Sequence, residues 1–287
     1  MAALFVNQLT TLDFSYLCPG RGLVGETWLV DVILRGELDE QGMVFDFGHV
    51  KKQIKSSLDR LADHRLLVPV KQPGTSVTSS SSQLTVRMAT NKQGFIECKA
   101  PCQAILLVDA TEITTDTLTP FLEQSLKSEL PDNVSSISLK LYPEQATGSF
   151  YHYSHGLKKH LGDCQRIAHG HRSLISITVD GLPAPELEDN WAQQWKDIYL
   201  AKKEDLLDTF NQDDMNYHRF GYTSDQGDFE LTLAADRCYL IETDTTVELL
   251  AEHIARTIAK RQPGKNVIIR ACEGFKKGAL AEYQVDG

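Results

Sequence analysis

The order of predicted elements occurs twice along the chain, and this repetition limits the fold more than any other feature of the sequence. In the first half, an alternating run at 28–34 predicts a strand, apolar residues at helical spacing over 50–61 predict a helix, and residues 82–100 predict a hairpin. A second helix over 116–130 and a strand over 134–142 complete the unit. Strands and helices in this order indicate an α+β fold.

The second half repeats the order. A strand is predicted over 173–179, a hairpin turns through 224–227, and a late helix spans 247–259. The helix between strand and hairpin is predicted from four apolar residues: Trp191, Trp195, Ile198 and Leu206. We therefore predict two tandem units, 1–146 and 147–287, that pack side by side as a pseudo-dimer.

Composition limits the partners that such a pair of units can have. The 287 residues carry 39 Asp and Glu against 29 Lys and Arg, a formal charge of -10, and no dense basic run, so no nucleic-acid partner is predicted. No apolar stretch reaches the ~18 to 20 residues that span a bilayer, and the first residues lack the order of a secretory signal. We predict a cytoplasmic protein with no membrane partner. Six dispersed cysteines predict reduced thiols.

Three histidines of the second half have the spacing of a metal site. His169 and His171 are two residues apart at a strand entrance, so alternation places them on one face. A neighbouring antiparallel strand with His155 would add a third imidazole and leave a fourth position open, as in catalytic zinc sites. The alternative is a surface loop that contains several histidines. Cys164 is either a small buried residue or, beside a divalent cation, a thiolate that moves protons.

At these residues the chain resembles the 6-pyruvoyl-tetrahydropterin synthase and 6-carboxytetrahydropterin synthase family. The match consists of five residues, the three zinc histidines, the cysteine and the late pterin-anchoring glutamate of the family: His155, His169, His171, Cys164 and Glu273. The resemblance implies two tandem T-fold (tunnelling-fold) units, with antiparallel sheets and helices packed on one face.

The first half resembles the family at other places. Residues 42–48 are similar to its helix entrance, and Asp63 and His64 are similar to the Asp-His pair that partners the cysteine. In the second half the corresponding stretch is predicted to be Met215–His218, and it contains no Asp-His pair.

Conversely, the first half lacks the three imidazoles. Tyr16 stands in place of the first zinc histidine, and Val24–Glu26 stands in place of the His-Gly-His segment. Family sites form at the seam between neighbouring units. The resemblance therefore implies one composite site, with zinc and Cys164 from the second half and Asp63 and His64 from the first.

The resemblance also implies a role for each residue. Zinc would act as a Lewis acid on the side chain of a reduced pterin. Cys164, as thiolate, and His64, oriented by Asp63, would move protons on opposite sides. Glu273 would accept hydrogen bonds from the pterin 2-amino group and ring N–H.

Some of these assignments have structural alternatives. Asp63 and His64 could be an ordinary exposed pair at a helix end, and Glu273 could be a solvated strand-end charge. Thr245 and Thr246 could hold the pterin edge, although a threonine at a helix start is commonly a cap.

The implied activity is that of a zinc-dependent lyase acting on 7,8-dihydroneopterin triphosphate. We favour the carboxy-forming branch, on the route to deazapurines such as queuosine, over the pyruvoyl-forming branch. Four residues separate Cys164 from His169, a spacing that selects neither branch. A pterin- or purine-binding protein without turnover, and other T-fold chemistry such as a cyclohydrolase or urate-oxidase-like reaction, remain alternatives. Because open sheet edges must be covered, a homo-oligomeric ring or barrel is predicted.

Overall fold

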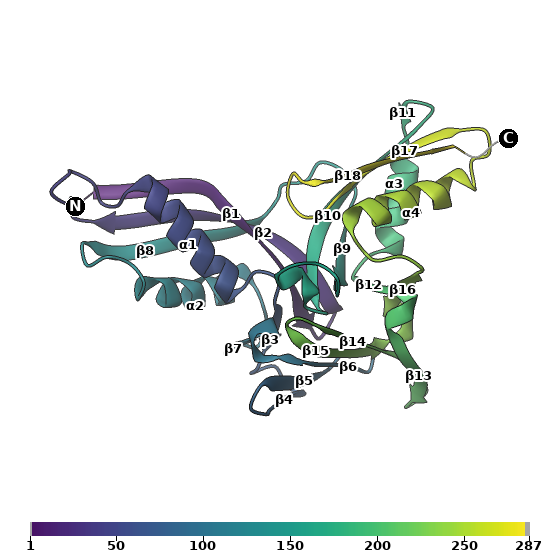
Figure 1. Cartoon of the computed structure of the whole chain (residues 1–287), viewed down its shortest axis with the longest axis horizontal. Coiled ribbons are helices and arrows are strands. Elements are labelled where there is room, and N and C mark those ends of the chain that lie inside the picture. The colour runs from purple at the N-terminus through teal and green to yellow at the C-terminus, as the bar shows by residue number, and fades with distance from the viewer. Residues whose placement is uncertain (1, 285–287) are drawn as a thin grey trace.

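The computed structural model describes residues 2–284 and contains two helix-covered sheets, one on each side of the molecule in Figure 1. The first sheet has the order β7-β3-β1-β2-β8, antiparallel from β1 to β8 and parallel from β1 to β7. Its strands are β1 (Ala2–Cys18), β2 (Gly22–Gly36), β3 (Leu66–Pro69), β7 (Ile105–Val108) and β8 (Val134–Pro143). Helices α1 (Phe47–Leu61) and α2 (Thr115–Lys127) cover one face.

The second sheet repeats this plan, with the order β16-β12-β9-β10-β17-β18. Its strands are β9 (Phe150–His155), β10 (His169–Val179), β12 (Ile198–Lys202), β16 (Cys238–Ile241), β17 (Asn266–Cys272) and β18 (Gly278–Gln284), with β11 (Leu182–Pro183) beside β10. Helices α3 (Pro185–Gln194) and α4 (Val247–Ala259) pack on one face. The predicted α+β class, with helices on one face of each sheet, is thus confirmed.

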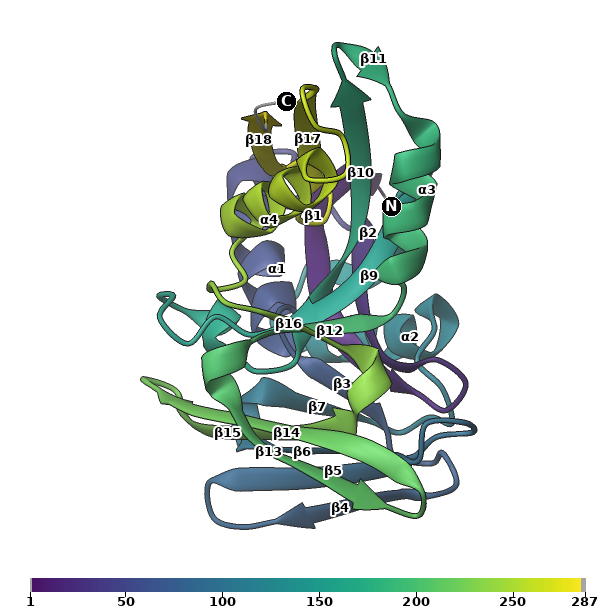
Figure 2. The same ribbon diagram turned by 90° about the vertical axis from the view of Figure 1, so that its right-hand side faces the viewer.

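A third sheet joins the two halves and lies below the two helix-covered sheets in Figure 2. Its order is β13-β14-β15-β6-β5-β4, and β15 pairs with β6, where Leu231 is opposite Cys98. Its strands are β4 (Thr75–Ser79), β5 (Gln83–Ala89), β6 (Phe95–Pro101), β13 (Leu206–Gln212), β14 (Met215–Ser224) and β15 (Gly227–Ala234). A hydrophobic cluster with residues from both halves packs against this sheet. The two units therefore share one continuous core as well as having cores of their own.

Two expectations about elements differ from the structure. The helix predicted through Ile198 and Leu206 is wrong, because α3 ends at Gln194 and those two residues begin β12 and β13. Asp197 has a left-handed φ of 55°, which stops helical geometry, and Ile198 instead pairs with Tyr153 of β9. The long first strand, β1, was not predicted. Across the described residues, no helix is both long and apolar enough to cross a membrane.

The two units touch through equivalent residues at the crossing of β1–β2 and β9–β10. Ser15 is opposite Gly25 in the first hairpin, and Ser154 is opposite Gly170 in the second. The two serine hydroxyls are 2.7 Å apart. A Cβ atom on Gly170 would lie 2.6 Å from the Cα of Gly25, so both positions need glycine for this approach. An approximate two-fold axis therefore runs through the contact, with one candidate seam on each side.

Candidate functional site

Three histidine side chains of the second half converge beside this crossing. His155 ends β9 and is directly opposite His169, the first residue of β10, while His171 is two residues further along the same strand face. All three side chains are at most 1% exposed. The ring centroids of His155 and His169 are 4.4 Å apart, and one ligand nitrogen from each of the three rings lies within 4.8 Å of the others. The structure thus brings together the three residues predicted as metal ligands.

The hydrogen-bond partners of these rings leave nitrogen lone pairs free. Nδ1 of His155 lies 3.0 Å from the Thr245 hydroxyl, and Nδ1 of His169 lies 2.9 Å from the Arg166 carbonyl oxygen. Among the described residues, Nε2 of His155 and both ring nitrogens of His171 have no hydrogen-bond partner. Burial holds the pKa of His155 and of His169 well below the usual range, so both rings are neutral. Buried, neutral and unpartnered imidazole nitrogens fit a divalent cation.

The Asp-His pair of the first half reaches this cluster across the seam. His64 follows α1 in a left-handed conformation, with φ 54°, and its Nδ1 lies 2.6 Å from Oδ2 of Asp63. One ligand atom each from His64, Cys164 and His169 lies within 4.8 Å of the others. The side chains of Asp63 and His64 are only 19% and 16% exposed, which does not match an ordinary exposed helix-end pair.

The environment of His64 favours its protonated form. Burial by itself would lower the pKa of His64, but the hydrogen bonds and charges of Asp63 and Cys164 outweigh burial and raise that pKa well above 6.5. Cys164 lies in the short 3₁₀ helix Asp163–Gln165 and is partly exposed. A histidine beside a cysteine can take part in proton transfer, because a thiol can give its proton to a neutral imidazole and a thiolate can accept one from an imidazolium.

The three remaining predicted residues are an acid near His171, a threonine that contacts His155 and a threonine that caps α4. Glu273 follows β17, is 24% exposed, and has Oε1 3.9 Å from Nε2 of His171. Thr246 is the N-cap of α4 and accepts a hydrogen bond from the Leu249 N–H, as the capping alternative expects. Thr245 is 2% exposed and contacts His155. Thr245 thus supports a histidine, and Thr246 supports a helix.

One residue at the site was missed from the sequence. Asp13 of β1 is 2% exposed and has Oδ1 3.3 Å from Nδ1 of His171. A signal for Asp13 exists in the sequence, since it is the acidic residue between Leu12 and Phe14 in an apolar stretch. A strand through these residues would point Asp13 away from the core that its two neighbours fill.

The seam on the other side of the two-fold axis has no imidazole cluster among the described residues. Tyr16, Val24 and Glu26 occupy the positions of the three histidines in the same strand register. The counterpart of His64 is Asp197, with φ 55°, which accepts two hydrogen bonds from Arg21. Met215–His218 therefore was the wrong counterpart: it lies in β14 of the joining sheet.

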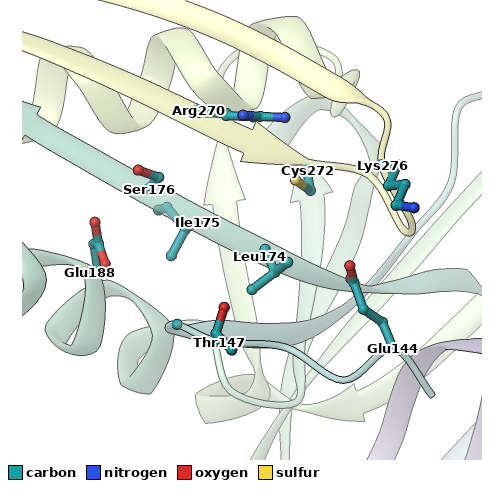
Figure 3. A pocket seen from close by; sticks show the side chains of 10 residues that line it. Glu144, Thr147, Leu174, Ile175, Ser176, Glu188, Arg270, Cys272 and Lys276 are labelled. Atoms are coloured by element: carbon teal, nitrogen blue, oxygen red, sulfur yellow. The ribbon is translucent and has the colours of Figure 1, made fainter.

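Two cavities lie near the link between the units. One, of about 730 Å³, adjoins the second seam and includes Arg21, His152 and Lys196 in its wall. The other, of about 310 Å³, lies between β10, β17 and the 144–148 link. Figure 3 shows Lys276 and Glu144 at one end of this smaller pocket. No predicted site residue lines either cavity.

Comparisons with known proteins agree with the tandem plan. The family model for 6-pyruvoyl tetrahydropterin synthase matches twice, at residues 21–152 and 144–284. A protein of Pyrococcus horikoshii, provisionally named 6-carboxy-5,6,7,8-tetrahydropterin synthase, is 24% identical over 136 residues, which are 46% of this chain and 76% of the relative. A protein of Pyrococcus abyssi with the same provisional name is 23% identical over 137 residues, again 46% of this chain and 76% of the relative. The crystal structure of 6-pyruvoyl tetrahydropterin synthase from Plasmodium vivax has 16% identity and a TM-score of 0.41, over 51% of this chain and 93% of that one.

Proposed function

The chain belongs to the 6-pyruvoyl tetrahydropterin synthase family, and we propose that it is a zinc-dependent lyase that acts on 7,8-dihydroneopterin triphosphate at a single composite site. The observation that carries this proposal is the meeting of two half-sites. His64 of the first half has its ligand atom within 4.8 Å of those of Cys164 and His169 of the second. We place the boundary between the T-fold units at residues 146 and 147; Met1 and residues 285–287 lie outside the described structure.

His155, His169 and His171 would hold the zinc ion, since their buried rings offer three nitrogen ligands. When bound, zinc supplies Lewis acidity toward the oxygens of the pterin side chain. Thr245 and the Arg166 carbonyl group orient two of the rings through Nδ1, which leaves Nε2 of each ring for the metal.

Cys164 and His64 would move the protons of the reaction. A thiolate at Cys164 can remove a proton from the substrate side chain, and His64, held by Asp63, can donate or accept a second one. Glu273 lies at the edge of the cluster, where an ionised carboxylate can accept two hydrogen bonds from the pterin ring.

The carboxy-forming branch is supported by the provisional names of the two Pyrococcus relatives. This branch belongs to the route to deazapurines such as queuosine. As a separate part of the proposal, we place the protein in the cytoplasm.

The reaction is tested by incubating the zinc-loaded protein with 7,8-dihydroneopterin triphosphate and identifying the products by mass spectrometry. We expect 6-carboxytetrahydropterin. A 6-pyruvoyl product would keep the lyase class but move the chain to the other branch. Unchanged substrate would contradict the proposal and leave a pterin- or purine-binding protein, or other T-fold chemistry, as the better account.

Cys164→Ala tests the proton-transfer role. We expect a loss of turnover by about 10²- to 10⁴-fold, the range for a removed acid or base, with substrate and zinc still bound. Cys102→Ala is the matched control, because Cys102 is exposed and lies outside the seam. Turnover in Cys164→Ala equal to that of the control would remove Cys164 from the mechanism.

A further inference from the structure

Asp13 is a buried acid, and an ionised side chain in a buried position needs hydrogen-bonding or charged partners. Its neighbours Leu12 and Phe14 are fully buried in the core of the first unit, so Asp13 points from β1 toward the seam. Its side chain is only 3% exposed. Because an unpaired buried carboxylate is costly, the contacts of Asp13 indicate what keeps it there.

The two carboxylate oxygens of Asp13 contact residues of both halves. Oδ1 accepts a hydrogen bond from the Thr27 hydroxyl and lies 3.3 Å from Nδ1 of His171. Oδ2 accepts a hydrogen bond from Nζ of Lys277 at 3.1 Å. The Thr27 hydroxyl and the Lys277 ammonium group are thus the hydrogen-bond donors that the buried carboxylate needs.

The Asp13 carboxylate lies next to Nδ1 of His171, a candidate metal ligand. An imidazole that binds metal through Nε2 needs an acceptor for its Nδ1–H, and a carboxylate there fixes both tautomer and ring orientation. Among the described residues, Nδ1 of His171 has no hydrogen-bond partner, and Oδ1 of Asp13 is a carboxylate oxygen 3.3 Å from it. The Asp13 carboxylate is thus placed beside the ring nitrogen that would need an acceptor.

The backbone of Asp13 holds the Asp-His pair. Its N–H donates to Oδ1 of Asp63 at 2.7 Å, and its carbonyl oxygen accepts from the N–H of His64 at 2.6 Å. The same residue thus contacts a candidate metal ligand of the second half and both members of the pair from the first.

The turn that carries Glu273 is seated on the Asp13 carboxylate. The Lys277 side chain donates a hydrogen bond to Oδ2 of Asp13. The backbone carbonyl oxygen of Lys277 accepts a hydrogen bond from the Glu273 N–H at 3.0 Å. A Cβ atom on Gly274, whose φ is +71°, would lie 2.5 Å from Oδ1 of Asp13. Glycine is therefore needed at this position for the turn to pack so close to the carboxylate.

The fold does not itself require an acid at this position. The equivalent residue of the second half is His152, which precedes Ser154 as Asp13 precedes Ser15. Its Nδ1 hydrogen-bonds the Gly25 carbonyl oxygen at the seam without imidazole ligands. The other hairpin thus has an imidazole at this strand position, and of the two equivalent positions only the one beside the histidine cluster carries a carboxylate.

We propose that Asp13 is a positioning residue through which the first unit orients the His171 ring and seats the Glu273 turn of the second unit. The proposal rests on the proposed function only in requiring that the histidine cluster binds metal, and it makes the metal affinity of one unit depend on a residue of the other.

The test compares Asp13→Asn with wild type in zinc affinity, measured by competition with a chromophoric chelator, and in the visible spectrum of the cobalt(II)-substituted protein. We expect Asp13→Asn to bind zinc about 10- to 100-fold more weakly, as for other residues behind a ligand, with a changed cobalt spectrum. Asp13→Glu should restore part of the affinity. Wild-type affinity and an unchanged spectrum in Asp13→Asn would overturn the proposal.

Asp197→Asn is the matched control. Asp197 is also a buried aspartate in an ion pair, but it lies at the seam without the cluster. We expect it to lower the melting temperature of the metal-free protein while leaving zinc affinity within about twofold, which separates a loss of stability from a loss of ligand positioning. A drop in zinc affinity equal to that of Asp13→Asn would overturn the proposal.

Should Asp13→Asn fail to fold, Thr27→Val takes its place, since it removes the hydroxyl that holds Oδ1 and keeps the carboxylate. A smaller loss of zinc affinity is expected, and no loss would overturn the proposal. Wild-type protein without tight zinc binding would contradict the proposed function as well. Tight zinc binding that is insensitive to Asp13 would contradict this inference alone.

Discussion

At the scale of single residues, the two seams show how side chains assign different chemistry to one backbone arrangement. Glu26 is the counterpart of His171, and the backbone register at both positions is the same. At one seam His171 faces the Asp13 carboxylate. At the other seam Glu26 is 7% exposed, and its Oε2 is 3.8 Å from Nδ1 of His152. Burial, opposed in part by the Thr27 N–H and Arg172, raises the pKa of Glu26 to about 7.

This raised pKa predicts a pH-dependent stability cost at Glu26. Between an ordinary 4.5 and about 7, the folded state holds a proton that the unfolded chain has released, so the free energy of unfolding falls as the pH rises through that window. Glu26→Gln cannot titrate. We expect it to raise the free energy of unfolding by about 1 to 3 kcal/mol at pH 8 and to have little effect below pH 4.5.

Denaturant unfolding at pH 4 and pH 8 measures this difference. Glu112→Gln, at an exposed glutamate in the loop before α2, is the control and should change little at either pH. An equal stability of Glu26→Gln and wild type at pH 8 would contradict a buried, proton-binding Glu26.

At the scale of elements, the β1–β2 and β9–β10 hairpins share a register and differ in what they present to the seam. The β9–β10 pair places three imidazoles together, while the equivalent positions of β1–β2 carry Tyr16, Val24 and Glu26. None of these three offers the neutral nitrogen that a zinc site needs.

We therefore expect one zinc ion per chain, measured by elemental analysis of protein freed of excess metal by gel filtration. His155→Ala should reduce the content to near zero, because it removes a ligand. His152→Ala, on the same strand but facing the other seam, should retain one. A wild-type value of two would show that the first unit also binds metal.

At the scale of the whole molecule, the joining sheet connects the two units into one body. The two helix-covered sheets still have open edges. The first sheet ends at β8, and the second ends at β18, where Leu280 is 74% exposed. The outer side of an edge strand has unpaired backbone groups that can pair with another chain. We propose that these edges meet in a homo-oligomeric ring or barrel.

Light scattering should show a mass of several chains. Leu280→Lys places a charge on the β18 edge and should shift the population toward monomer, whereas Leu161→Lys, in an exposed loop, should not. A monomeric wild-type protein would contradict the ring.

The amino-acid sequence by itself determined the α+β class, the tandem order and the pairing of His169 with His171 on one strand face. These properties follow from local spacing, since alternation and helical periodicity act over a few residues. Local spacing also gave a wrong prediction at α3. Trp191, Trp195 and Ile198 have helical spacing, but Ile198 pairs with β9 and is part of a strand.

Only the tertiary structure decided that Asp13 and Lys277 meet at the seam. The hydrogen bond between Lys277 and Asp13 joins residues 264 positions apart, and the pairing of β15 with β6 joins the two halves. Which strand ends cross, and which buried acid faces His171, depend on how the two units pack. That packing is a property of surfaces assembled from distant segments, so no local pattern of the chain specifies it.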